Sequence, residues 1–78
     1  MKIEFRLYAS LSAYMPEKSR GALEIDVNEG TRIRELLDRF KVPADSVKII
    51  FLNGVHARGG EVLHEGDRVG VFPPIAGG

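Results

Sequence analysis

Alternating apolar and polar residues predict strands near both ends of the chain. In residues 2–8 every second side chain is apolar, from Ile3 to Leu7, which is the period of a strand with one buried face. Residues 22–27 show the same alternation and are expected to pair with the first strand as a hairpin. Residues 68–72 predict the last strand.

The middle of the chain predicts a helix followed by a second pair of strands. Residues 32–40 form an amphipathic pattern, with Thr31 as the expected N-cap. The apolar positions of this helix are Ile33, Leu36, Leu37 and Phe40. Residues 47–52 predict a strand that is apolar on both faces. The Asn53-Gly54 pair that follows is a strong tight-turn signal and leads to a short strand over residues 55–57.

The order of the predicted elements is strand, strand, helix, strand, short strand, strand, which indicates the α+β class. One amphipathic helix covers only one face of a sheet, so we expect a mixed sheet of four to five strands with that helix across one face. This layout is the β-grasp, or ubiquitin-like, fold. A shorter helix over residues 11–15, which Ser10 would cap and Pro16 would end, is expected between the first two strands.

Composition narrows the possible functions. The 78 residues fit one domain. The chain has no cysteine, which excludes disulfides, thiolate metal sites and a thiolate nucleophile. Eleven basic and eleven acidic residues cancel, so we expect no nucleic-acid partner. No hydrophobic run at the N-terminus has the length of a signal peptide or a membrane span, so we expect a cytoplasmic protein without a membrane partner.

Two other features have ordinary explanations. His56 and His64 are the only histidines, and they lack both the helical spacing and the third ligand of a metal site, so we expect no metal. Gly59-Gly60 lacks the preceding strand and following helix of a phosphate-binding loop, so we expect a surface turn there.

The last residues carry the most specific signal. Pro73 and Pro74 cannot continue a sheet ladder and favour extended backbone, so we expect a domain over residues 1–72 and a projecting tail over residues 73–78. Such a tail could reach roughly 20 Å at ~3.3–3.6 Å per residue. Its final Gly77-Gly78 adds no side-chain width, which suits a narrow channel. A bare Gly-Gly end is more often only frayed, but the proline pair before it favours a functional tail.

This ending resembles that of the small subunit of molybdopterin synthase, a ubiquitin-like sulfur carrier whose family ends in a phenylalanine, two prolines, a small spacer and Gly-Gly. The matching residues are Phe72, Pro73, Pro74, Ile75, Ala76, Gly77 and Gly78. Weaker similarity covers the rest of the chain, at residues 8–11, 52–54 and 66–69. The thiamin-pathway sulfur carrier shares the fold and the Gly-Gly end but usually lacks the proline pair. Ubiquitin-like protein modifiers are further relatives.

The resemblance implies chemistry at the α-carboxyl of Gly78 and at no side chain. A ubiquitin-activating-type adenylyltransferase would use ATP to form the Gly78 acyl-adenylate, and a sulfurtransferase would convert it to a thiocarboxylate. The tail would then enter the large subunit of molybdopterin synthase and pass its sulfur to a pterin precursor. The carrier itself would bind no cofactor. Sulfur transfer to thiamin or tRNA, attachment to lysines of other proteins, and a β-grasp adaptor without chemistry are the alternatives.

A surface shared by these partners is expected on the sheet face away from the helix. If Val69 and Val71 point into the core, alternation puts Arg68 and Phe72 on the opposite face. The register of the neighbouring strand favours Phe51 on that same face. We therefore expect Phe72, Arg68 and Phe51 to bind partners. The alternative is that Phe72 folds back to cover the edge of its own domain.

Overall fold

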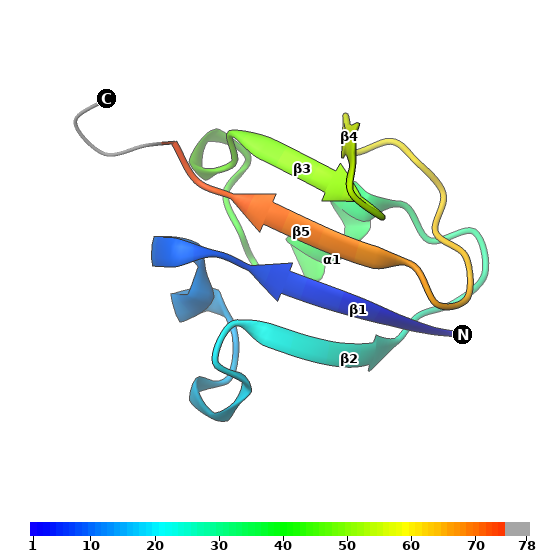
Figure 1. Cartoon of the computed structure of the whole chain (residues 1–78), viewed down its shortest axis with the longest axis horizontal. Coiled ribbons are helices and arrows are strands. Elements are labelled where there is room, and N and C mark those ends of the chain that lie inside the picture. Colours follow the sequence, from blue (N-terminus) through cyan, green and yellow to red (C-terminus); the bar gives the residue numbers. More distant parts are fainter. Residues whose placement is uncertain (75–78) are drawn as a thin grey trace.

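The structure is a computed structural model, and it describes residues 1–74 of the 78-residue chain. Five strands, one α-helix and three 3₁₀ helices follow one another along these residues (Figure 1). The strands are β1 (Lys2–Leu7), β2 (Ala22–Asp26), β3 (Ile49–Leu52), β4 (Val55–Ala57) and β5 (Arg68–Phe72). The helices are η1 (Ala9–Tyr14), η2 (Glu17–Ser19), α1 (Ile33–Arg39) and η3 (Ala44–Ser46). No helix in this part of the chain has the length and apolar character needed to cross a membrane.

The strands form one mixed sheet in the order β2-β1-β5-β3-β4 (Figure 1). β1 and β5 run parallel at its centre, and the other pairs are antiparallel. In this register Phe5 lies opposite Leu23 on one side and Val69 on the other. α1 lies across one face of the sheet. The predicted α+β class and β-grasp fold are confirmed, with five strands in the sheet.

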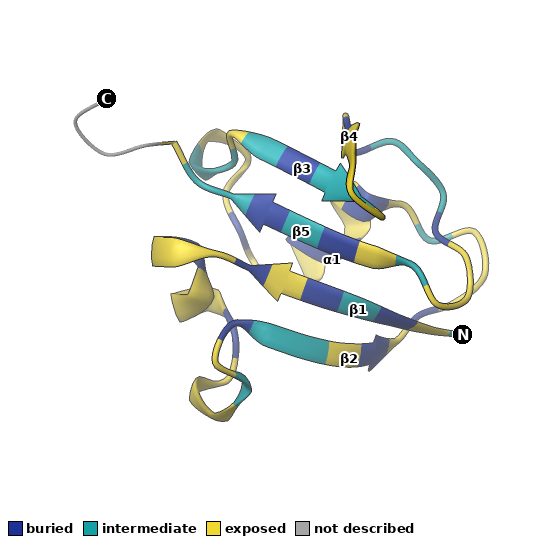
Figure 2. Cartoon of the chain, viewed as in Figure 1, coloured by how far each residue is buried: buried dark blue, intermediate teal, exposed yellow. Residues whose placement is uncertain are grey.

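The core lies between the sheet and α1. Buried residues alternate with less buried ones along the two central strands (Figure 2). Phe5, Val69 and Val71 of these strands each expose at most 1% of their surface. The helix adds the buried side chains of Ile33, Leu36 and Leu37. Burying a side chain of this size stabilises a fold by about 1.5–3 kcal/mol. In a chain without disulfides, this single cluster is the main source of stability.

The start of α1 differs from its sequence prediction. Thr31 is not the cap, because its hydroxyl donates to the carbonyl oxygen of Asn28 at 2.6 Å. Arg32 occupies the N-cap position, and its N–H donates to the Glu35 carboxylate at 2.8 Å. The first turn of the helix is thus held by an acidic side chain three residues further on, and not by a hydroxyl that precedes it.

Two other boundaries also differ. η1 is a 3₁₀ helix that begins after Tyr8, contains Ser10 and has no side-chain cap, so the predicted serine cap is wrong. The reason is that Ala9 adopts a φ of 51°, which turns the chain into η1 directly after the first strand. β3 is shorter than the predicted 47–52 because Val47 still belongs to the end of η3.

The loop over residues 58–61 is tied to α1. The Glu61 carboxylate accepts the N–H of Arg58 at 2.9 Å and the N–H of Gly59 at 2.8 Å. The carbonyl of Gly59 in turn accepts the N–H of Arg34 at 2.9 Å. The hydrogen bonds from these backbone donors, Arg58 first, favour the ionised carboxylate and lower the pKa of Glu61.

We predict that Glu61→Gln reduces the acid sensitivity of the domain. Because the pKa of Glu61 is lowered in the folded state, its carboxylate stabilises the fold above the unfolded pKa of about 4.3. This contribution is lost as the pH falls through the lower folded value. Urea midpoints measured from about pH 7 to about pH 3 should therefore fall more steeply for the wild type than for Glu61→Gln.

Glu29→Gln is the matched control for this measurement. Glu29 is exposed on the turn before α1, and its side chain makes no hydrogen bond or ion pair within residues 1–74. This variant should follow the wild-type curve. Parallel curves for all three proteins would contradict the stabilising role of the Glu61 carboxylate.

Candidate partner-binding surface and tail base

Three aromatic side chains gather on the sheet face away from α1. Tyr8 stacks on Phe72, with ring centroids 4.1 Å apart and planes inclined by 3°. Phe51 meets the Phe72 ring edge-on, with centroids 5.8 Å apart. We refer to Tyr8, Phe51 and Phe72 as the aromatic patch. Aromatic pairs in these geometries contribute about 0.5–1.5 kcal/mol beyond their buried area, so each ring helps to hold the others in place.

The alternation of the strands explains why two of the rings meet. Val69 and Val71 are buried in the core, so Phe72 projects from the other face of β5 and is half-buried there. Ile50 of β3 lies opposite Val71 and is also buried. The next residue, Phe51, therefore faces the same side as Phe72. The predicted faces of both phenylalanines are confirmed, whereas their role in binding partners stays a prediction.

Tyr8 completes the patch and was missed by the sequence prediction. Its backbone N–H donates to the carbonyl of Val71 at 3.0 Å, which continues the pairing of β1 with β5 by one residue. Gly70 makes room for the ring, since a Cβ at that position would lie 3.2 Å from Cε2 of Tyr8. The available signals were the alternation of the first strand beyond Leu7 and a glycine inside a strand, which often marks a close approach.

A charged region adjoins the aromatic patch. The Arg6 Nε and Glu4 Oε2 atoms are 2.6 Å apart, and this hydrogen bond raises the pKa of Arg6. Glu4 is also the register partner of Arg68, which is exposed as predicted. These three side chains and the patch line one open groove of about 340 Å³. Arg68 makes no ion pair within residues 1–74, so its charge is available to a partner.

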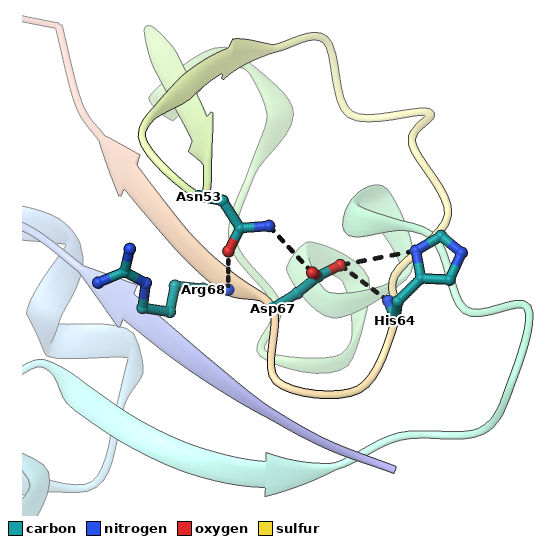
Figure 3. Close-up of polar contacts among 4 residues, drawn as sticks. All are labelled: Asn53, His64, Asp67 and Arg68. Carbon is teal, nitrogen blue, oxygen red and sulfur yellow. Dashed lines mark hydrogen bonds and ion pairs between the residues drawn. The ribbon is translucent and has the colours of Figure 1, made fainter.

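Polar contacts hold the start of β5 in place (Figure 3). The Asn53 side chain donates to Asp67 Oδ1 at 2.9 Å and accepts the N–H of Arg68 at 2.9 Å. The other oxygen of Asp67 accepts the N–H of His64 at 2.8 Å. These contacts tie the turn between β3 and β4 to the first residue of β5. Among residues 1–74, no three His, Cys, Asp or Glu side chains lie close enough to hold a metal ion.

The base of the tail begins where β5 ends, at Phe72 as predicted. The Phe72 carbonyl accepts the N–H of Lys48 at 2.8 Å. Pro73 is half-buried and Pro74 is exposed. The two prolines border a second groove together with Ser10, Leu11, Tyr14, Asp45 and Ser46. The other predicted tail residues, Ile75, Ala76, Gly77 and Gly78, lie outside the described residues, so their role and the projecting tail over residues 73–78 stay predictions.

Comparison with known families identifies the relatives of this chain. Residues 10–78 match the ThiS family. The chain belongs to the ThiS family. The predicted membership of the ubiquitin-like sulfur carriers is therefore confirmed. None of the curated protein sequences compared with this ThiS-family chain matches it significantly.

Solved structures similar to this ThiS-family chain share its whole fold. A putative molybdopterin converting factor subunit 1 from Pyrococcus furiosus has a TM-score of 0.73 and 27% identity, over 96% of this chain and 99% of that one. SAMP1 from Haloferax volcanii has a TM-score of 0.75 and 22% identity, over all of both chains. A complex of subunits 1 and 2 of the molybdopterin-converting factor from Helicobacter pylori provides a chain with a TM-score of 0.65 and 23% identity, again over all of both chains.

We predict that Gly70→Val separates Tyr8 from Phe72. A valine side chain would need the space of the tyrosine ring, because even a Cβ there lies 3.2 Å from Cε2 of Tyr8. In NMR spectra, the ring protons of both residues should lose the upfield shifts that stacked rings impose on each other. Gly70→Ala should cause smaller changes in the same direction. Unchanged ring shifts in a folded valine variant would contradict the stacked arrangement.

Proposed function

We propose that this chain is a sulfur carrier that serves as the small subunit of molybdopterin synthase. The observation that carries the proposal is the ending from Phe72 to Gly78, with its proline pair and Gly-Gly, on a ThiS-family β-grasp domain. Pro73 and Pro74 support the molybdopterin branch, as does the 27% identity with the putative Pyrococcus furiosus subunit. In this proposal the sulfur is held as a thiocarboxylate on the α-carboxyl of Gly78.

The proposed chemistry takes place on that carboxyl group. An α-carboxyl has a pKa of about 3.5, so it is a carboxylate at neutral pH and a poor electrophile. An adenylyltransferase of the ubiquitin-activating type attaches the AMP part of ATP to this carboxylate and releases pyrophosphate. A sulfurtransferase then supplies sulfur at the oxidation level of sulfide, which attacks the acyl carbon and displaces AMP. The carrier binds no cofactor in this scheme, because the ATP is bound by the activating enzyme.

Sulfur is then transferred inside the large subunit of the synthase. Gly77 and Gly78 make the end of the tail no wider than its backbone, which allows it to enter a narrow channel. Pro73 and Pro74 restrict the backbone before entry, so less conformational entropy is lost on binding. The sulfur passes to a pterin precursor, and water supplies the oxygen that restores the carboxylate of Gly78 for another cycle.

The groove at the aromatic patch is the proposed docking surface for these partners. Phe51 and Phe72 offer apolar ring area, and Arg68 adds an exposed positive charge at the rim of the groove. Aromatic and arginine side chains are enriched among the residues that dominate binding energy at interfaces. Because the adenylyltransferase, the sulfurtransferase and the large subunit all need the same tail, they use this surface in turn.

We predict that the intact protein from its native host includes a species that has exchanged one oxygen for sulfur. Intact mass spectrometry detects the exchange, and fragmentation should locate it at Gly78. The reason is that a carrier spends part of its cycle as the thiocarboxylate. Covalent ladders with other proteins would identify a protein modifier instead, and the absence of both species would favour an adaptor without chemistry.

We also predict that deletion of Gly78 abolishes sulfur transfer and leaves the fold intact. The last carboxyl group would then lie one residue short of the place where the activating enzyme and the synthase act. Transfer is measured as formation of the pterin dithiolene with purified partners, and folding is measured by the urea midpoint. A fully active truncated protein would refute the carrier mechanism. Sulfur delivery to a thiamin or tRNA acceptor, and not to the pterin, would assign the carrier to those pathways.

A further prediction concerns the docking surface. Arg68→Glu should slow association with the adenylyltransferase and the large subunit, and the effect should shrink at high salt. Phe51→Ala should instead speed dissociation by up to about 30-fold, which corresponds to about 2 kcal/mol. Both are measured by surface plasmon resonance. Lys18→Glu reverses a charge in η2, outside the groove, and equal effects at positions 18 and 68 would contradict a docking role for Arg68.

A further inference from the structure

The stacked pair Tyr8–Phe72 lies at the base of the tail as well as in the groove. Phe72 is the last residue of β5, and Pro73 and Pro74 follow it directly. The two rings are close to parallel, with planes inclined by 3° and centroids 4.1 Å apart. A side chain that holds the Phe72 ring therefore acts at the point where the tail leaves the sheet.

Hydrogen bonds hold the backbone of both residues. The N–H of Tyr8 donates to the Val71 carbonyl at 3.0 Å, and the Tyr8 carbonyl accepts the N–H of Leu11 at 3.0 Å. The Phe72 carbonyl accepts the N–H of Lys48 at 2.8 Å. The Tyr8 ring therefore extends from a backbone held by hydrogen bonds, and it packs face to face against the Phe72 ring.

The two prolines restrict the backbone that follows Phe72. A residue that precedes proline is restricted to extended backbone conformations, and this applies to both Phe72 and Pro73. Each proline also holds its own φ near about −65°. A tilt of the Phe72 backbone would also move its ring, and stacking on the Tyr8 ring opposes that movement.

The direction of the tail at its base has a large effect at a distance. A tilt of about 10° displaces a point about 7 Å further on, the reach of the two prolines, by about 1 Å. A misplacement of about 1 Å at a reacting centre is enough to cost about 100-fold in rate. A reactive group carried at the end of such a segment therefore depends on a well-defined base.

We propose that Tyr8 is a positioning residue whose ring fixes Phe72 and thereby the direction in which Pro73 and Pro74 deliver the tail to an enzyme. It acts within the free carrier, before any partner binds, and so does more than add contact area to the groove. Gly70 is also needed for this arrangement, because a side chain there would displace the Tyr8 ring. The role rests on the proposed function, since the direction of the tail matters only if the tail must enter a partner.

The first test uses the free full-length protein. Carbon-13 relaxation at the Cα atoms of Pro73 and Pro74 should show larger fast motion in Tyr8→Ala than in the wild type. Tyr8→Phe keeps a stacking ring and should restore the wild-type values. Phe51→Ala removes the edge-on contact with Phe72 but leaves the stack, so its effect should be smaller than that of Tyr8→Ala. Equal order at both prolines in all four proteins would overturn the positioning role.

The second test separates positioning from docking by steady-state sulfur transfer with the purified partners. Tyr8→Ala should lower kcat by about threefold to tenfold, the range expected for losing an aromatic pair. Tyr8→Phe should recover most of that loss. Phe51→Ala should mainly raise KM, because it removes docking area. A Tyr8→Ala variant that raises KM and keeps the wild-type kcat would overturn the proposal, since it would make Tyr8 a contact residue only.

The two proposals fail in different ways. If the wild-type chain transfers no sulfur to any acceptor, the proposed function fails, and the relaxation experiment still decides whether Tyr8 orders Pro73 and Pro74. If the wild type transfers sulfur and Tyr8→Ala matches it in both order and kcat, the carrier function stands and the positioning role falls.

Discussion

The parallel pairing of β1 with β5 is the constraint on which the rest of the molecule depends. In that pairing Leu7 lies opposite Val71. The residues that follow them, Tyr8 and Phe72, are therefore neighbours at the same end of the two central strands. An antiparallel pairing would have placed Phe72 near the start of β1. Parallel neighbours need a long crossover connection, and here it contains β2, α1, β3 and β4. The chain between the two central strands thus contains the other elements of the domain. The pairing of those two strands places Tyr8 beside Phe72, the residue before Pro73.

The two faces of the sheet have different tasks. The inner face carries the apolar residues that pack against α1 and hold the fold together. Within residues 1–74 no helix lies over the outer face. Charged side chains line much of β1 there, including the ion pairs Lys2–Glu24 and Arg6–Glu4. Exposed ion pairs add little stability, but they keep the open face polar. The aromatic patch is an apolar part of that face, and it lies at the end of β5.

Strong local patterns could be read from the sequence, and interactions between distant residues could not. Alternation gave the strands and placed Phe72 on the outer face, because its period is fixed by the backbone. The cap at Thr31 was predicted wrongly because a distant loop occupies the N–H groups that such a cap would bind. Those of Ile33 and Arg34 donate to backbone carbonyls of residues 59–61. Tyr8 was missed because its place depends on the register between the first and last strands and on Gly70, and alternation along one segment carries no information on either.

Phe72 joins the two proposed tasks of this small domain in one side chain. One face of its ring is stacked by Tyr8, and Phe51 approaches it edge-on from β3. A partner that docks in the groove as proposed would therefore touch the same ring that is proposed to set the direction of the tail. A carrier whose chemistry resides on a terminal carboxyl group needs no catalytic side chain of its own. Its domain must instead supply a surface that partners recognise and a defined direction for the tail. In the two proposals, the ring of Phe72 contributes to both.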